Sequence, residues 1–158
     1  MCVMILIMDV DGTLTDGHIY ISPSGEMMKS FNVKDGYGIA NILPEKGIVP
    51  VIITGRISDI VKMRCEELGI KEIYQGVNDK VKLLKSLLEK LDEVAYIGDD
   101  LNDFECMMAI KNAGGLIGCP SDAIKEIIDI SDFVSEKSGG NGAVRDFIEW
   151  IIKKRNIN

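Results

Sequence analysis

The sequence predicts an α/β fold in which helices sandwich a Rossmann-like parallel sheet. Apolar runs at residues 3–8 and 49–53, and a weaker one at 93–97, are typical of strands buried on both faces of such a sheet. Segments with helical spacing of apolar residues lie between them. This alternation requires right-handed crossovers between parallel strands. The length of 158 residues suits one ordinary domain, and we expect a single domain over residues 1–158.

Each main strand is expected to end at a polar residue. Asp9 follows the first run, Thr54 the second, and Gly98 and Asp99 the third. Shorter apolar stretches predict further strands at 72–74, 116–118 and 132–134. The carboxyl ends of parallel strands meet at one edge of the sheet, where open α/β sheets bind ligands. We therefore expect the polar residues to lie together.

Helices are predicted at 58–68, from Lys80 to residue 91, and at 144–152, because the apolar residues of each fall on one face. The last helix closes with Lys153, Lys154 and Arg155, cations that are favourable at a helix C-terminus. A helix at 41–46 is less strongly predicted, because Pro44 lies inside it.

One segment interrupts the alternation, between the first strand and its helix. Residues 18–22 and 27–33 predict two strands, and the Pro- and Gly-containing residues 23–26 predict the turn of a β-hairpin. Ile19, Ile21, Met27 and Phe31 would give this hairpin apolar surface with no core beneath it, and such surface usually binds a partner. We expect residues 18–33 to be an oligomerisation arm; the alternative is a hairpin folded back on its own domain.

Composition excludes several classes of protein. The net charge of −7, from 25 acidic and 18 basic residues, argues against a nucleic-acid partner, although a metal ion can still reverse the charge of one pocket. The apolar runs are far shorter than the ~20 residues of a membrane span, and no secretory signal is evident, so we expect a cytoplasmic protein that binds no membrane. The four cysteines form no CxxC pair and are expected as reduced core thiols. One histidine, His18, leaves almost nothing for a His-rich metal site or a Ser-His-Asp triad.

Acidic residues dominate the expected sheet edge. Asp9, Asp11 and Asp99 cannot all stay ionised in one crevice without a cation. An oxygen-rich site with few protein ligands suits Mg²⁺, which keeps bound waters and accepts phosphate as a further ligand. The alternative is that these residues are helix caps and loop acids, which explains each residue singly but not their common position.

This edge also carries groups suited to phosphate transfer. Asp9, at the strand tip, is placed to attack phosphorus and form an acyl phosphate. Asp11, two residues on, can protonate the leaving oxygen and later deprotonate water. The remaining groups would bind phosphate oxygens or offset their charge, and they are the Gly12 N–H, the Thr54 hydroxyl and the Lys80 ammonium.

The ordered set DxDGT, TG, K and GDDxxxD resembles the haloacid dehalogenase superfamily of aspartate-nucleophile phosphatases. Residues 31–39, 54–56, 64–70, 74–76 and 139–145 resemble its capless branch, and the likeness runs from about residue 5 to residue 152. The resemblance implies a Mg²⁺-dependent homotetramer whose inserted hairpins form a central barrel. It also implies an active site shielded by a neighbouring subunit, including that subunit's C-terminal segment.

The resemblance also implies roles for single residues. Asp9 and Asp99 would bind the metal through their side chains, and Asp11 through its backbone carbonyl. Asp103 would orient Lys80 or a metal-bound water. Arg56 and Arg64 match positions that face a sugar acid's carboxylate, a task that suits the bidentate guanidinium. The expected substrate contacts are Gly12, Asn32, Lys34, Asp35, Gly36, Thr54, Gly55, Arg56, Arg64, Lys80 and Asn102.

The substrate that the resemblance implies is an anionic sugar phosphate, first 3-deoxy-D-manno-octulosonate 8-phosphate, with a place in lipopolysaccharide biosynthesis. The alternative is a 3-deoxy-nonulosonate 9-phosphate of the KDN or sialic acid type. Two residues keep it open: Ala40 stands where the octulosonate enzymes often carry Arg, and Asn102 resembles the nine-carbon relatives. Arg56 counts against that alternative, because nine-carbon relatives typically carry Glu there. A receiver-like signalling domain is a distant alternative, since receivers place the phosphorylated Asp on a later strand.

Overall fold

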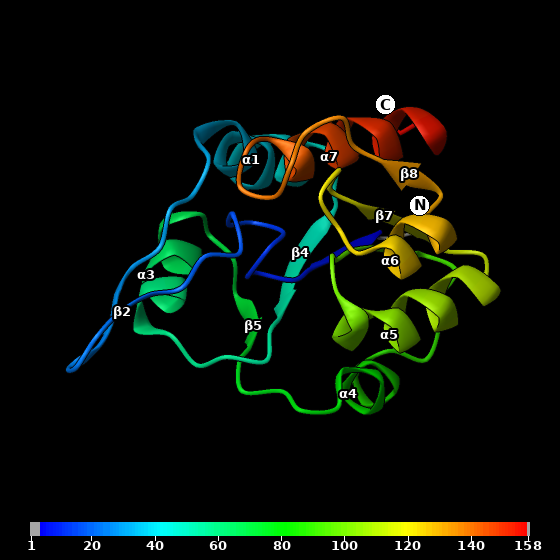
Figure 1. Ribbon diagram of the computed structural model, residues 1–158. Coiled ribbons are helices and arrows are strands. Elements are labelled where there is room, and N and C mark those ends of the chain that lie inside the picture. Colours follow the sequence, from blue (N-terminus) through cyan, green and yellow to red (C-terminus); the bar gives the residue numbers. More distant parts are fainter. Residues whose placement is uncertain (1–3, 158) are drawn as a thin grey trace.

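The computed structural model describes residues 4–157 and contains the expected parallel sheet (Figure 1). Its six strands lie in the order β5-β4-β1-β6-β7-β8, and every neighbouring pair is parallel. The strands are β1 (Ile5–Met8), β4 (Val49–Ile53), β5 (Glu72–Tyr74), β6 (Val94–Ile97), β7 (Leu116–Cys119) and β8 (Phe133–Val134). All six expected strands of the sheet are confirmed within a residue or two, although residue 3 of the first lies outside the described residues.

The central strands carry the site. β1 pairs with β4 on one side and with β6 on the other, so that Met8 is level with both Ile52 and Ile97. From β1 the chain first builds β4 and β5 on one side, and later β6, β7 and β8 on the other. The direction of winding therefore reverses beside β1, and ligands bind at such a switch point in open α/β sheets.

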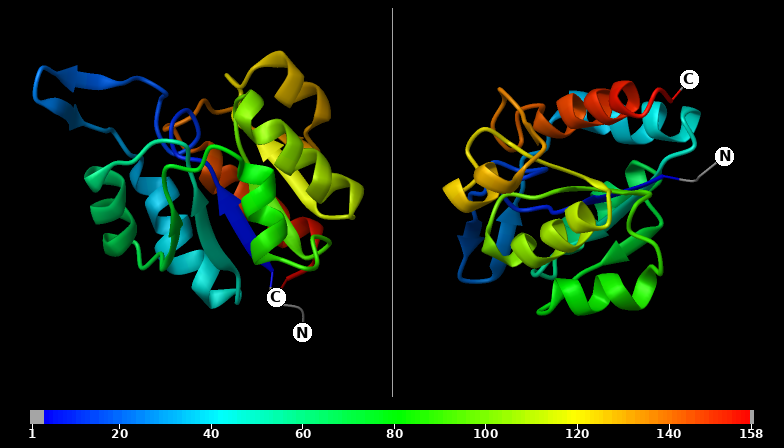
Figure 2. Two further views of the ribbon diagram at one scale, coloured as in Figure 1. Left: turned by 90° about the horizontal axis from the view of Figure 1, so that it is seen from below. Right: turned by 90° about the vertical axis from the view of Figure 1, so that its right-hand side faces the viewer.

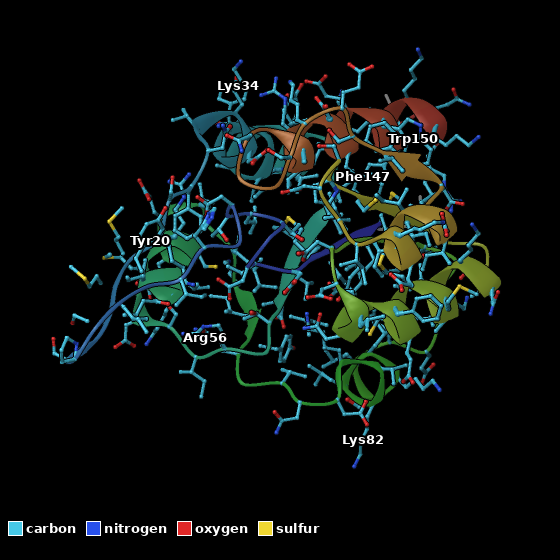
Figure 3. All side chains as sticks on the ribbon, in the orientation of Figure 1. Tyr20, Lys34, Arg56, Lys82, Phe147 and Trp150 are labelled. Atoms are coloured by element: carbon cyan, nitrogen blue, oxygen red, sulfur yellow. The ribbon has the colours of Figure 1, made fainter. Side chains whose placement is uncertain are left out.

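Helices cover both faces of the sheet (Figure 2). One face packs against α3 (Asp59–Glu67), α7 (Ala143–Lys154) and a helical segment made of α1 (Val33–Tyr37), a π-helix (Gly38–Ile42) and α2 (Leu43–Glu45). The other face packs against α4 (Lys80–Leu87), α5 (Leu101–Asn112) and α6 (Lys125–Ile130). Each layer has its own buried cluster. Phe147 and Trp150 of α7 (Figure 3) stack on each other and on Phe133 of β8.

Several helix boundaries differ from the prediction. The helix expected at 41–46 is the end of a longer helical segment that begins at Val33. Pro44 fits because it lies in the first turn of α2, where a missing N–H costs little. The helix after Lys80 ends at Leu87 rather than residue 91, and helices α5 and α6 were not predicted.

The inserted hairpin lies where it was expected and projects from the body of the molecule (Figure 1). It consists of β2 (Tyr20–Ser22) and β3 (Gly25–Met28), which are antiparallel. The second strand is shorter than predicted, because residue 33 already belongs to α1. Ile21 is 65% exposed and Met27 64% exposed, so the tip of the hairpin has no core beneath it within its own chain.

Two further expectations concern chemistry and environment. Three of the cysteines, Cys65, Cys106 and Cys119, are buried and unpaired, as predicted, and Cys2 lies outside the described residues. Among residues 4–157, no helix combines the length and apolar character that crossing a bilayer requires.

Candidate active site

Three neighbouring strands deliver the central residues of the site. Asp9 follows β1, Thr54 follows β4, and Asp99 lies two residues beyond β6. Asp9 and Thr54 are buried, and Asp99 is partly buried. Carboxylate oxygens of Asp9, Asp99 and Asp103 lie within 4.8 Å of one another. The expected gathering of acidic groups at the carboxyl edge is therefore present.

Lys80 is the cation of this cluster. It is the first residue of α4, a helix whose N-cap is Asp79, and it is almost fully buried. Its Nζ donates hydrogen bonds to Oδ1 of Asp9 and to Oδ1 of Asp103, each at 2.9 Å. Burial lowers the pKa of Lys80, but Asp9 and Asp103 raise it more, so that the pKa lies above its ordinary value. The side chain is a permanent ammonium.

Asp103 holds this arrangement in place. One of its oxygens accepts hydrogen bonds from Lys80 and from the Tyr96 hydroxyl, the latter at 2.6 Å. The other accepts the backbone N–H of Asp99 at 3.1 Å and takes part in the capping box that starts α5. Both oxygens are thus occupied by protein donors, which suits an orienting residue better than a direct metal ligand. Tyr96, which points inward from β6, was missed in the sequence because it reads as an ordinary core aromatic.

The cluster holds more negative charge than positive charge. Burial raises the pKa of Asp9 well above its ordinary value, with a further contribution from Asp103. Burial likewise raises the pKa of Asp99 to about 6. One ammonium is shared among three carboxylates, so a further cation would be stabilised here. The hard oxygen donors of Asp9 and Asp99 fit Mg²⁺.

The loop after β1 is shaped to bring its backbone close to the carboxylates. Gly12 has φ +88°, and a side chain at this position would overlap the Asp99 carboxylate. Thr13 donates from its hydroxyl to Asp99 Oδ1 at 3.1 Å. The Gly139–Gly140 segment packs directly on this loop, and the Gly140 N–H donates to the Thr13 carbonyl at 3.1 Å. Its glycines therefore allow a close approach that larger residues would block.

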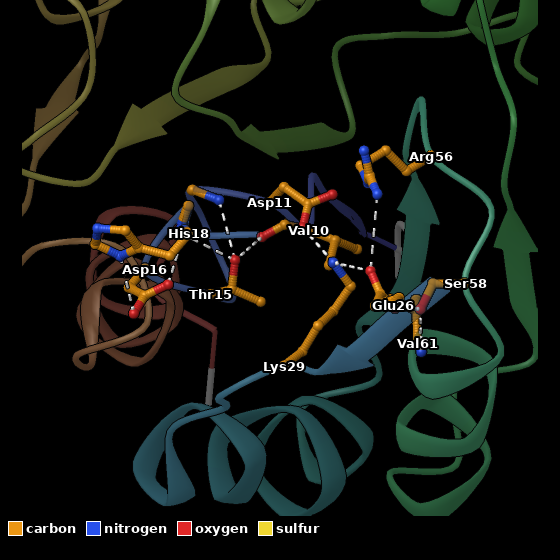
Figure 4. Close-up of polar contacts among 12 residues, drawn as sticks. Val10, Asp11, Thr15, Asp16, His18, Glu26, Lys29, Arg56, Ser58 and Val61 are labelled. Atoms are coloured by element: carbon orange, nitrogen blue, oxygen red, sulfur yellow. Dashed lines mark hydrogen bonds and ion pairs between the residues drawn. The ribbon is translucent and has the colours of Figure 1, made fainter. Parts of the chain in front are cut away.

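The Asp11 side chain points toward the stem of the hairpin (Figure 4). Its Oδ1 lies 2.6 Å from Nζ of Lys29, which is also 3.1 Å from Oε2 of Glu26. Glu26 accepts a hydrogen bond from the Ser58 hydroxyl and lies 4.0 Å from the Arg56 guanidinium. No pattern in the sequence points to Lys29 or Glu26, because charged residues in a predicted hairpin are typical of a solvated surface.

The residues expected to contact a sugar fall into two groups. Gly55 and Arg56 are exposed just after the carboxyl end of β4, and Asn102 is exposed in the first turn of α5. The others lie at the N-cap of α1, within α1 and on α3, and they are Asn32, Lys34, Asp35, Gly36 and Arg64.

In the second group, the side chains of Asn32, Asp35 and Arg64 have partners within the chain, although Oδ2 of Asp35 and Nε of Arg64 are buried without a hydrogen-bond partner among the described residues. Asn32 caps α1, and Asp35 accepts the backbone N–H of Arg145 at 2.9 Å. Arg64 packs against Gly36, pairs with Glu67 at 2.9 Å and lies over the Phe31 ring. Lys34 is exposed on the outer side of α1 (Figure 3). Contact between these residues and a substrate stays a prediction.

Known proteins resemble this chain over most of its length. It is 43% identical over 154 residues to the 3-deoxy-D-manno-octulosonate 8-phosphate phosphatase KdsC of Escherichia coli K12, which covers 95% of this chain and 79% of the relative. No protein-family model matches the chain.

Solved structures agree in fold. The 3-deoxy-D-manno-octulosonate 8-phosphate phosphatase of Moraxella catarrhalis, in complex with a magnesium ion, a phosphate ion and a KDO molecule, has a TM-score of 0.85 and 41% identity, and the match covers 98% of this chain and 88% of that one. The cobalt-bound enzyme of Haemophilus influenzae has a TM-score of 0.86 and 34% identity, with 98% and 90% covered.

Proposed function

Because the chain belongs to the 3-deoxy-D-manno-octulosonate 8-phosphate phosphatase family of haloacid dehalogenase-type hydrolases, we propose that it hydrolyses the phosphate ester of that sugar acid through an aspartyl-phosphate intermediate. The chain is a phosphoric monoester hydrolase by family membership. The observation that supports the mechanism best is Asp9, buried at a strand tip between Lys80 and Asp99.

The metal would be held by the side chains of Asp9 and Asp99 and by the backbone carbonyl of Asp11. When bound, Mg²⁺ supplies the positive charge that lets an anionic phosphate approach a carboxylate nucleophile. Lys80 adds a fixed charge beside Asp9, where its Nζ donates a hydrogen bond to one carboxylate oxygen.

In the first step, a carboxylate oxygen of Asp9 bonds to phosphorus while the bond from phosphorus to the sugar oxygen breaks. The electron pair of that bond stays on the sugar oxygen, which takes a proton from the Asp11 carboxyl. In the second step, Asp11 accepts a proton from water as the water oxygen bonds to phosphorus, and the Asp9 carboxylate leaves. Inorganic phosphate is released, and both aspartates return to their starting states.

The remaining groups hold the phosphoryl oxygens. The Thr54 hydroxyl and the Gly12 N–H are the proposed donors. The parallel pairing of β1 and β4 supports the position of Thr54 next to Asp9. The Gly12 N–H lies in the loop after β1, where it donates to the Thr15 hydroxyl oxygen at 3.2 Å and would have to turn to the phosphate instead. Donors that are fixed before the reaction stabilise charge as it develops, without reorganising. Gly55, Arg56 and Asn102, exposed at the rim, are proposed to contact the sugar acid.

We also propose that the enzyme is a cytoplasmic homotetramer, assembled through the hairpin, in which a neighbouring subunit helps to close each site. The exposed apolar side chains of the hairpin support this assembly. We further propose that residues 1–158 form a single domain.

A 3-deoxy-nonulosonate 9-phosphate is the second candidate substrate. Asn102 and Ala40 favour it, since both differ from the octulosonate pattern, and Asn102 is exposed in the first turn of α5. A comparison of kcat/KM on the two sugar-acid phosphates distinguishes the candidates. A receiver-like domain is not supported, because the candidate phosphate acceptor, Asp9, follows the first strand and not a later one.

The test is phosphate release from a panel of sugar-acid phosphates with Mg²⁺. We expect the octulosonate 8-phosphate to give the highest kcat/KM, and Asp9→Asn to lower turnover by roughly a thousandfold or more while circular dichroism stays unchanged. Asp129→Asn, an exposed aspartate on α6, serves as the matched control with normal activity. An Asp9→Asn enzyme that retains more than a few per cent of activity would refute the assigned nucleophile.

A further inference from the structure

Lys29 is a buried cation that the chemistry above does not use. It lies between β3 and α1, and its side chain is only 2% exposed. Most lysines keep the ammonium in water, because burial without partners costs several kcal/mol. A lysine buried this fully therefore needs an explanation in its partners.

Its partners connect the hairpin to two loops of the active site (Figure 4). The ammonium lies 2.6 Å from Asp11 in the loop after β1 and 3.1 Å from Glu26, three residues earlier in the hairpin. Glu26 in turn accepts a hydrogen bond from Ser58, the N-cap of α3, in the segment after β4. Lys29 is thus held from two sides while it contacts Asp11.

The charges in this chain of contacts are stable. Burial lowers the pKa of Lys29, but hydrogen bonds to Asp11 and Glu26 raise it more, so that the pKa is above its ordinary value. Burial raises the pKa of Glu26, yet hydrogen bonds from Ser58 and Lys29 leave it below its ordinary value. Lys29 is therefore an ammonium and Glu26 a carboxylate, and the two form an ion pair.

We propose that Lys29 is a positioning residue that aims the Asp11 carboxyl for proton transfer to the leaving sugar oxygen. Its N–H donates to Oδ1 of Asp11, so the acid proton must be carried on Oδ2. The same contact fixes the rotation of the carboxyl group, and general acid catalysis requires that geometry. This role rests on the proposed function of Asp11 as the acid–base group.

The consequence is a dependence on the leaving group. A sugar alkoxide is a poor leaving group and needs the proton from Asp11, whereas p-nitrophenolate leaves without one. kcat/KM is the quantity to compare, since it includes only the steps up to the first irreversible one, the transfer of phosphate to Asp9. A residue that merely braces the fold or the metal site would affect both substrates equally.

The experiment measures kcat/KM of Lys29→Met on the sugar-acid phosphate and on p-nitrophenyl phosphate, with saturating Mg²⁺. We expect a loss of roughly ten- to a hundredfold on the sugar phosphate and less than about threefold on the aryl phosphate. Asp11→Asn should show the same selectivity, and the double variant should lose little more than Asp11→Asn alone. Lys29→Arg should recover part of the loss, and Lys82→Met, exposed on α4, should behave like the wild type.

Equal losses on both substrates, no loss on either, or additive losses in the double variant would overturn the proposal. If Lys29→Met fails to fold, Glu26→Gln, which weakens the hold on Lys29, carries the same expectation in weaker form. A wild-type enzyme inactive on every sugar-acid phosphate would refute the proposed substrate alone, because any alkyl phosphate that it does cleave still tests Lys29 against the aryl ester.

Discussion

At the scale of single residues, the site is defined by negative charge that the protein alone does not neutralise. Lys80 is shared between Asp9 and Asp103, and Asp99 receives only a hydroxyl hydrogen bond from Thr13. Gly12 shows that this crowding is built into the backbone, since its positive φ and its contact with Asp99 both exclude a side chain. The sequence motif predicts these residues because each is needed for close approach or for charge.

The raised pKa values of Asp9 and Asp99 predict how Mg²⁺ binding depends on pH. In the metal-free protein both pKa values are higher folded than unfolded, so the folded state holds more protons and stability falls as pH rises. For Asp99 this window runs from about pH 4 to about pH 6. Mg²⁺ competes with those protons. The stabilisation by Mg²⁺ should therefore be small at pH 5 and reach about 2.7 kcal/mol at pH 7.5 for a concentration one hundred times Kd.

Thermal unfolding with and without Mg²⁺ at both pH values measures this effect. Asp99→Asn is the control, because it removes one of the titrating ligands and should abolish most of the difference between the two pH values. An equal rise in Tm at pH 5 and pH 7.5 in the wild type would show that protonation of these carboxylates does not govern binding.

At the scale of elements, the sequence was most informative where one physical pattern dominates. The apolar runs of β1 and β4 and the apolar face of α7 depend only on local spacing, and all were found where expected. α5 was missed because it is buried on more than one side, against α4, α6 and the sheet, which blurs its periodicity. The sequence predicts a strand that ends at residue 33 and no helix before residue 41, because the capping Asn32 and the glycines of this segment also occur in turns.

The sequence predicts that the hairpin joins subunits, and its exposed apolar side chains are the feature that this prediction depends on. Its exposed Ile21 and Met27 are expected to be buried between subunits. We predict that Ile21→Asp combined with Met27→Asp lowers the assembly from tetramer to smaller species, because burying a charge at such an interface costs several kcal/mol.

Sedimentation velocity measures the mass, and circular dichroism monitors the fold. Leu87→Asp, at the partly exposed end of α4 and away from the hairpin, should leave the mass unchanged. A double variant that keeps the mass of the wild type, or a monomeric wild type, would contradict the role of the hairpin as the oligomerisation arm.

At the scale of the whole molecule, the site exists because the strand order brings three distant segments together. The sequence could predict that Asp9, Thr54 and Asp99 follow strands, and the rule for parallel sheets placed those strand ends at one edge. It could not predict Lys29, Glu26 or Tyr96, whose roles depend on how the stem of the hairpin meets the loops after β1 and β4 and on how β6 faces α5. Such contacts join residues that carry no local pattern of their own.

The central claim is that phosphate passes through the side chain of Asp9. The most direct measurement is a rapid acid quench of the enzyme during turnover of its sugar-acid phosphate with Mg²⁺, followed by peptide mass mapping of the trapped protein. The account predicts one phosphoryl group on the peptide that contains Asp9, removed by hydroxylamine and absent from Asp9→Asn. Steady release of phosphate with no phosphorylated peptide at any quench time, or phosphorylation at another residue, would contradict it.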